Sequence, residues 1–199
     1  DTITGGGGAD YIDLSEETSA ADIVVQTAIA TLGSYGGSLS AHDAADTIKG
    51  FESGSDIYHF QDAETTLAGS ELWTSGSITT VGDGLNFSID TLIDTGGDNT
   101  LDIDVVELVG GNTSNADLSS AVDGSELLKL LAIDSETAGG IELAADQDKL
   151  YLIAYDDGNA YLYNIQEAAT DATLIAGDEA GEIKLAAVFE GMTSGGLAS

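Results

Sequence analysis

The sequence of 199 residues contains no cysteine, no proline and no arginine, and it has only four lysines. Without cysteine there can be no disulfide, no thiolate metal site and no cysteine nucleophile. With so few basic residues, no basic patch can form to displace counter-ions from phosphates, so we expect no nucleic-acid partner. No apolar run is long enough to predict a membrane-spanning helix.

Acidic residues dominate the charge: 36 Asp and Glu give a formal net charge of −32. Self-repulsion of that size opposes compaction unless counter-ions bind or the ionic strength is high. Two interpretations of the total charge remain open. It serves solubility in a salty setting, or it collects a hard divalent cation, which prefers oxygen ligands.

Motifs of catalysis are also scarce. The two histidines, His42 and His59, do not stand in an HExxH pattern, and there is neither a Gly-x-Ser-x-Gly elbow nor a phosphate-binding glycine loop. The many carboxylates leave a glycosidase-type acid pair formally open. We therefore expect a protein that is not an enzyme.

A glycine-rich nonapeptide stands near the start of the chain. Residues 5–13 read Gly-Gly-Gly-Gly-Ala-Asp-Tyr-Ile-Asp, which matches the Gly-Gly-x-Gly-x-Asp-x-apolar-x repeat of calcium-binding parallel β-helices. Residues 1–4 look like the Asp-x-apolar-x end of a preceding copy, which suggests that the chain begins inside a repeat. Residues 21–25 keep Asp-x-apolar but lack the glycines.

A second pair of acidic, strand-like segments follows at residues 45–51 and 54–60. Their pattern resembles the segment that closes the β-roll in RTX (hemolysin-type calcium-binding) proteins, and with residues 5–13 the resemblance covers about the first third of the chain. The matching residues are Asp46, Ile48, Phe51, Gly54, Asp56 and Tyr58.

The resemblance implies a Ca²⁺ site in which successive coils hold the ion. Its loop ligands would be Gly6 and Gly8, through their carbonyls, and Asp10, through its carboxylate, while Asp1 takes the Asp position of the previous coil. Asp46 and Asp56 either complete a site at the end of the roll or are exposed strand aspartates.

We expect a mainly β fold. Residues 1–60 would form a short calcium-binding parallel β-roll end with its closing strands, and residues 61–199 an antiparallel β domain with one short helix. That helix should follow Ser125, because a good N-cap precedes an acidic first turn and an apolar stripe.

Several strands are predicted in the second region. Residues 102–109 alternate acidic and apolar side chains, which is typical of a strand with one wet face. Residues 149–155 and 159–164 should form an antiparallel hairpin across Asp156-Asp157-Gly158. Further strands are expected at residues 77–81, 85–89 and 182–191.

Residues 148–191 resemble the C-terminal domain of bacterial RTX surface proteins that leave the cell by type I secretion. Together, the acidic composition and the two resemblances predict a secreted calcium-binding structural protein of a bacterial surface. It would be a self-assembling subunit of a surface layer, sheath or extracellular filament, with a type I exporter as a further partner. The alternative is a non-catalytic export and folding domain of a larger RTX hydrolase or adhesin. A carbohydrate-binding module stays open on the tyrosines alone.

Overall fold

The structure is a computed structural model. It describes residues 1–26, 45–52, 55–60, 71–73, 78–82, 105–109, 115–130, 141–142, 150–165, 173–174 and 183–193. The strand expected at residues 85–89 lies outside these described ranges.

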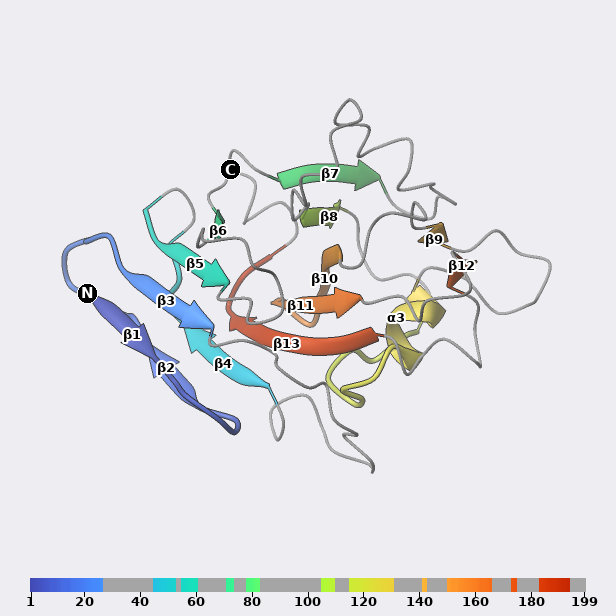
Figure 1. Cartoon of the computed structure of the whole chain (residues 1–199), viewed down its shortest axis with the longest axis horizontal. Helices are drawn as coiled ribbons and strands as arrows, with labels where there is room; N and C mark the ends of the chain where they lie inside the picture. Colours follow the sequence, from blue (N-terminus) through green and yellow to red (C-terminus); the bar gives the residue numbers. More distant parts are fainter. Residues whose placement is uncertain are drawn as a thin grey trace.

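The first five strands alternate between two sheets as the chain winds forward. Strands β1, β3 and β5 lie parallel to one another in one sheet, and β2 and β4 lie parallel in the other. Figure 1 shows these strands together at one side of the molecule, beside the C-terminal strand β13. Their bounds are β1 Thr2–Thr4, β2 Tyr11–Asp13, β3 Ile23–Gln26, β4 Asp46–Lys49 and β5 Ile57–Phe60.

Strands from the rest of the chain extend both sheets. In the four-stranded sheet, β6 pairs antiparallel with β5. The seven-stranded sheet has the order β2-β4-β13-β11-β10-β8-β7, and so contains strands from both sides of residue 60. The remaining elements are β6 Glu71–Trp73, β7 Ile78–Gly82, β8 Val105–Val109, α3 Ser125–Leu130, β9 Ile141–Glu142, β10 Leu150–Asp156, β11 Asn159–Ile165, β12 Thr173–Leu174 and β13 Ile183–Glu190.

The predicted hairpin is confirmed as β10 and β11. Asp156 pairs with Asn159, and the two residues between them, Asp157 and Gly158, have φ values of 47° and 78°. Two consecutive residues of positive φ make the tight turn whose twist suits a hairpin, and Asp-Gly is a favoured sequence for it. The short helix is also confirmed, as α3.

The expectation of an antiparallel second region is wrong. Strand β8 lies parallel to both β7 and β10, and β13 lies antiparallel to β11 but parallel to β4. The large sheet is therefore mixed. The wet-face prediction for residues 102–109 also fails at Glu107, which is fully buried, because β8 is an interior strand whose Glu107 pairs with the core residue Ile153.

Two hydrophobic cores lie on the two faces of the large sheet. One contains Tyr163, Val188 and the helix residues Leu127 and Leu128. The other joins the N-terminal strands to the hairpin and β13, through Ile12, Val24, Ile48, Tyr58, Ile153, Leu162 and Phe189. Among the described residues, no helix is long and apolar enough to cross a membrane.

Phe189 of β13 marks the junction of the second core. Its ring lies edge-to-face with Phe51 at 5.1 Å and with Tyr58 at 5.5 Å between centroids. Such aromatic pairs stabilise a core beyond the area that they bury. The C-terminal strand is thus packed into the N-terminal strands as well as paired with them.

Candidate metal site

An aspartate stands at the start of each of the first five strands. The residue two positions later points between the two sheets, because side chains alternate along a strand. Four of these five inward residues are buried, and the fifth, Ile3, packs against the same core. The five aspartates are Asp1, Asp10, Asp22, Asp46 and Asp56.

These aspartates are joined from one strand to the next by a repeated hydrogen bond. The backbone N–H of Asp10 donates to Oδ1 of Asp46 at 3.0 Å, and that of Asp22 donates to Oδ1 of Asp56 at 3.0 Å. The α-ammonium group of Asp1 makes the equivalent contact with Oδ1 of Asp22 at 2.5 Å. Each carboxylate thus fixes the strand before it.

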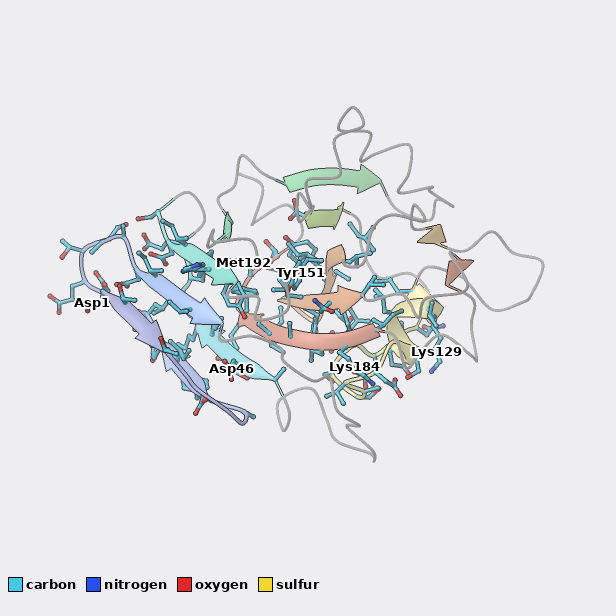
Figure 2. The ribbon with its side chains drawn as sticks, viewed as in Figure 1. Asp1, Asp46, Lys129, Tyr151, Lys184 and Met192 are labelled. Carbon is cyan, nitrogen blue, oxygen red and sulfur yellow. The ribbon has the colours of Figure 1, made fainter. Side chains whose placement is uncertain are left out.

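These hydrogen bonds divide the predicted site residues into two groups. Asp10 and Asp46 lie together at the turn from β1 to β2. Asp1 lies beside Asp22, next to Asp56, in the other sheet. Figure 2 draws Asp1 and Asp46 well apart. The structure therefore does not bring Asp1 to Asp10.

Residues 5–10, which we call the glycine turn, bring two carboxylates to one point. A Cβ atom added to Gly5 would lie 2.9 Å from Oδ2 of Asp10 and 3.1 Å from Oδ2 of Asp46. Only glycine therefore fits here without movement of a carboxylate. Gly6 and Gly8 have φ values of 99° and 112°, which L side chains rarely adopt.

Within the described residues, no ion pair is formed by Asp10 or Asp46. Oδ2 of Asp10 is buried and has no hydrogen-bond partner within the described ranges. The three ion pairs of the described residues involve Asp22, Asp13 and Glu126, and none reaches Asp10 or Asp46. A buried, unpaired carboxylate oxygen is costly unless a cation or donor meets it.

Electrostatics at Asp46 agree with this geometry. Burial raises the pKa of the Asp46 carboxyl, and the neighbouring charge of Asp10 raises it further, against the opposing effect of the Asp10 N–H bond. The raised pKa means that the folded protein disfavours the charged form of Asp46. A divalent cation between the two carboxylates would reverse that preference.

The opposite turn, formed by Glu16, Asp22, Glu52 and Asp56, is satisfied internally. Asp56 accepts the N–H of Asp22 at Oδ1 and the N–H of Glu52 at Oδ2, at 2.7 Å. The Asp1 ammonium group lowers the pKa of Asp22. The pKa of Glu16 is raised, because its protonated carboxyl donates a hydrogen bond to the Asp22 carboxylate. Asp56, a predicted ligand, already uses both oxygens.

Three buried acids of the structure, Asp22, Glu107 and the helix residue Glu126, are missing from the sequence-based candidates. Asp22 could have been found, because residues 21–25 repeat the Asp-x-apolar-x pattern without glycines. Glu107 accepts a hydrogen bond from the Tyr155 hydroxyl, and its Oε2 is buried without a partner in the described part of the chain. Its acidic-apolar alternation gave the opposite signal, of a wet strand.

Side chains alone do not complete a metal site in the part of the chain that the structure describes. No three His, Cys, Asp or Glu residues there gather closely enough to hold an ion. Asp10 and Asp46 supply two carboxylates, and other oxygens would have to come from the backbone of the glycine turn or from water. No protein-family model, curated protein or solved structure matches the chain.

Proposed function

We propose that the chain is a calcium-binding structural protein of a bacterial cell surface, of the RTX type. The observation that carries the proposal is the convergence of Asp10 and Asp46 on Gly5, with Oδ2 of Asp10 buried and unpartnered in the described residues. Ca²⁺ takes six to eight oxygen ligands in flexible geometry, which suits two carboxylates and backbone carbonyls. Gly6 and Gly8 of the glycine turn would supply such carbonyls.

The arrangement of β1 to β5 supports a short parallel β-roll. Alternation between two sheets, with parallel neighbours in each, is what successive coils of a roll produce. Coils spaced about 4.8 Å apart place like charges over one another. Calcium would turn this repulsion into attraction, so ion binding becomes part of the folding free energy.

Self-assembly is the biological role that the charge favours. A chain of net charge −32 repels its own copies. A divalent cation removes part of that repulsion and switches association on. The protein would then be a secreted subunit of a surface layer, sheath or filament, delivered by a type I exporter.

A second function, as an export and folding domain of a larger RTX protein, is favoured by one observation. Strand β13 pairs with β4 along Asp46–Lys49, and Phe189 packs on Phe51 and Tyr58. The C-terminal region thereby covers an edge of the N-terminal strands, as a cap would. Ordered assemblies in the presence of calcium would favour the first function, and a calcium-loaded monomer the second.

The experiment has two parts. Calcium is titrated into the 199-residue chain in a calorimeter, and thermal melts are recorded with and without chelator. We expect binding and a melting temperature that rises with calcium. Asp10→Asn should abolish both effects.

The matched control is Asp13→Asn, because Asp13 lies on the same strand pair but is exposed and paired with Lys49. It should keep wild-type calcium binding. A melting temperature that chelator leaves unchanged would contradict the proposed calcium site.

A further inference from the structure

Two buried polar side chains lie opposite each other where β11 pairs with β13. Asn164 of β11 is the register partner of Lys184 of β13, and the two residues are only 3% and 8% exposed. Their neighbours on the two strands, Tyr163 and Leu185 among them, belong to the core that packs on α3. Because side chains alternate along a strand, Asn164 and Lys184 both point to the other face of the large sheet.

Neither side chain is committed to another group in the part of the chain that the structure describes. Oδ1 of Asn164 is buried and has no hydrogen-bond partner there. Lys184 is not a member of any of the three ion pairs that the described residues form. The amine and the amide are therefore neighbours that have no competing contact among the described residues.

An acid lies on the other side of Lys184. Asp123 forms an isolated antiparallel bridge with Lys184, and beside the bridge the N–H of Leu185 donates to the carbonyl of Val122 at 2.9 Å. This pattern makes Asp123 and Lys184 a non-hydrogen-bonded pair, in which the two side chains lie close together. Figure 2 shows Lys184 at the end of β13 that lies next to α3.

We propose that Lys184 and Asn164 join in an intramolecular isopeptide bond, which ties β13 to β11. Opposed Cβ atoms of neighbouring strands lie about 4.5–5.5 Å apart, and the four-carbon stem of lysine is long enough to bring Nζ to Cγ of Asn164. Water is the competing nucleophile, and the burial of both side chains largely excludes it.

The reaction needs no oxidant and no co-reactant. The Lys184 ammonium group gives a proton to the Asp123 carboxylate, and the amine then attacks Cγ of Asn164. The Nζ–Cγ bond forms and the Cγ–Nδ2 bond breaks. Nδ2 takes up the proton from Asp123 and the proton that Nζ gives up, and it leaves as an ammonium ion.

This bond goes beyond the proposed function, and it suits a chain that has no cysteine. A covalent link between residues 164 and 184 closes a loop of the chain, which stabilises a fold mainly by restricting the unfolded state. Strand β13 also pairs with β4. The link would therefore hold in place the strand that connects the hairpin to the N-terminal strands.

The test is the intact mass of the purified chain, measured by mass spectrometry. The wild type should be lighter than its sequence by about 17 Da, the mass of the ammonia that is lost. Lys184→Arg keeps the positive charge but cannot form the bond, and it should show the full sequence mass, as should Asn164→Ala. Lys129→Arg is the matched control, because Lys129 is exposed and pairs with Glu126. It should show the same loss of mass as the wild type.

Digestion with trypsin locates the bond. A linked Lys184 is not cleaved, so Asn164 and the residues after 184 should remain in one peptide. Asp123→Ser tests the proton acceptor, since serine can still cap α3, and part of this variant should keep the full mass.

A wild-type chain of full sequence mass would overturn the inference, and so would the same loss of mass in Lys184→Arg. A complete loss of ammonia in Asp123→Ser would overturn the role of Asp123. The proposed calcium site and self-assembly would stand in each case, because neither uses Lys184 or Asn164.

Discussion

The glycine turn and the opposite turn both contain aspartates of the Asp-x-apolar-x pattern, yet the two turns use these aspartates differently. At the glycine turn, Asp46 accepts one backbone N–H and Oδ2 of Asp10 meets no partner in the described residues. At the opposite turn, Asp56 accepts two backbone N–H groups and Asp22 meets an ammonium group. Only the first side keeps carboxylate oxygens for an ion.

The difference separates two roles that one motif can combine. In both sheets, Oδ1 of the aspartate accepts the N–H of the strand before, so this role belongs to the fold. The environment of Oδ2 decides whether the residue can also bind a cation. At Asp10, beside Gly5, Oδ2 has no hydrogen-bond partner among the described residues.

The largest effect is expected at the opposite turn. Asp56→Ala leaves the N–H groups of Asp22 and Glu52 without an acceptor, which should lower the free energy of unfolding by about 2–4 kcal/mol. Urea denaturation in chelator measures it. Asp46→Ala removes the acceptor of one N–H, that of Asp10, and should cost less under the same conditions. If Asp46→Ala lowers the free energy of unfolding more than Asp56→Ala does, the proposed difference between the two turns is wrong.

A test away from both turns uses Gly124, which leads into α3. A Cβ atom there would lie 2.6 Å from Cβ of Ile183 on β13. Gly124→Ala should therefore overpack the site and lower the free energy of unfolding by about 1–3 kcal/mol. The loss should be equal with and without calcium. If calcium offsets the loss of unfolding free energy in Gly124→Ala, then the contact of α3 with β13 is coupled to the glycine turn more tightly than proposed.

Gly5→Ala sharpens the assignment of the ion to the glycine turn. The added methyl group would occupy the point that Asp10 and Asp46 share, so calcium affinity should fall at least about tenfold, or about 1.4 kcal/mol. Gly7→Ala is the matched control, since a Cβ there meets nothing within 4 Å and no positive φ is involved. Calorimetry with equal affinities for the two variants would place the ion elsewhere.

The smallest effect concerns the α-amino group of Asp1. Its hydrogen bond to Asp22 raises its pKa above 8.0. The stability that this group contributes is therefore fully present below pH 8 and is lost as the pH rises through the raised value. Acetylation of the amine should remove that decline in melting temperature. An unchanged pH profile would show that Asp22 does not depend on the ammonium group.

Local features of the fold could be predicted from the sequence. Asp157-Gly158 between two apolar runs determined the hairpin, and Ser125 before Glu126 indicated the helix. Both depend on residues close together in the chain, whose conformational preferences act directly.

Long-range pairing could not be predicted. Nothing near β13 indicates that it lies parallel to β4, because that contact depends on the fit of Phe189 among Phe51 and Tyr58. For the same reason the sequence alone does not predict which strand lies beside Asp1. Asp10 is nearer in the sequence, but the sheet register brings Asp1 to Asp22. The prediction that Glu107 faces solvent is wrong because alternation of acidic and apolar residues is typical of a strand at a surface, whereas β8 is an interior strand.

The pairing of β13 with β4 also has a consequence for the order of folding. Residues 46–49 meet residues 187–190, so the N-terminal strands keep an open edge until the ribosome has made nearly all of the described chain. Contacts of such high sequence separation form slowly, and open edges invite aggregation in the meantime. Like-charge repulsion in a chain of −32 delays compaction further. The same acidity would thus keep the unfinished chain apart from its neighbours.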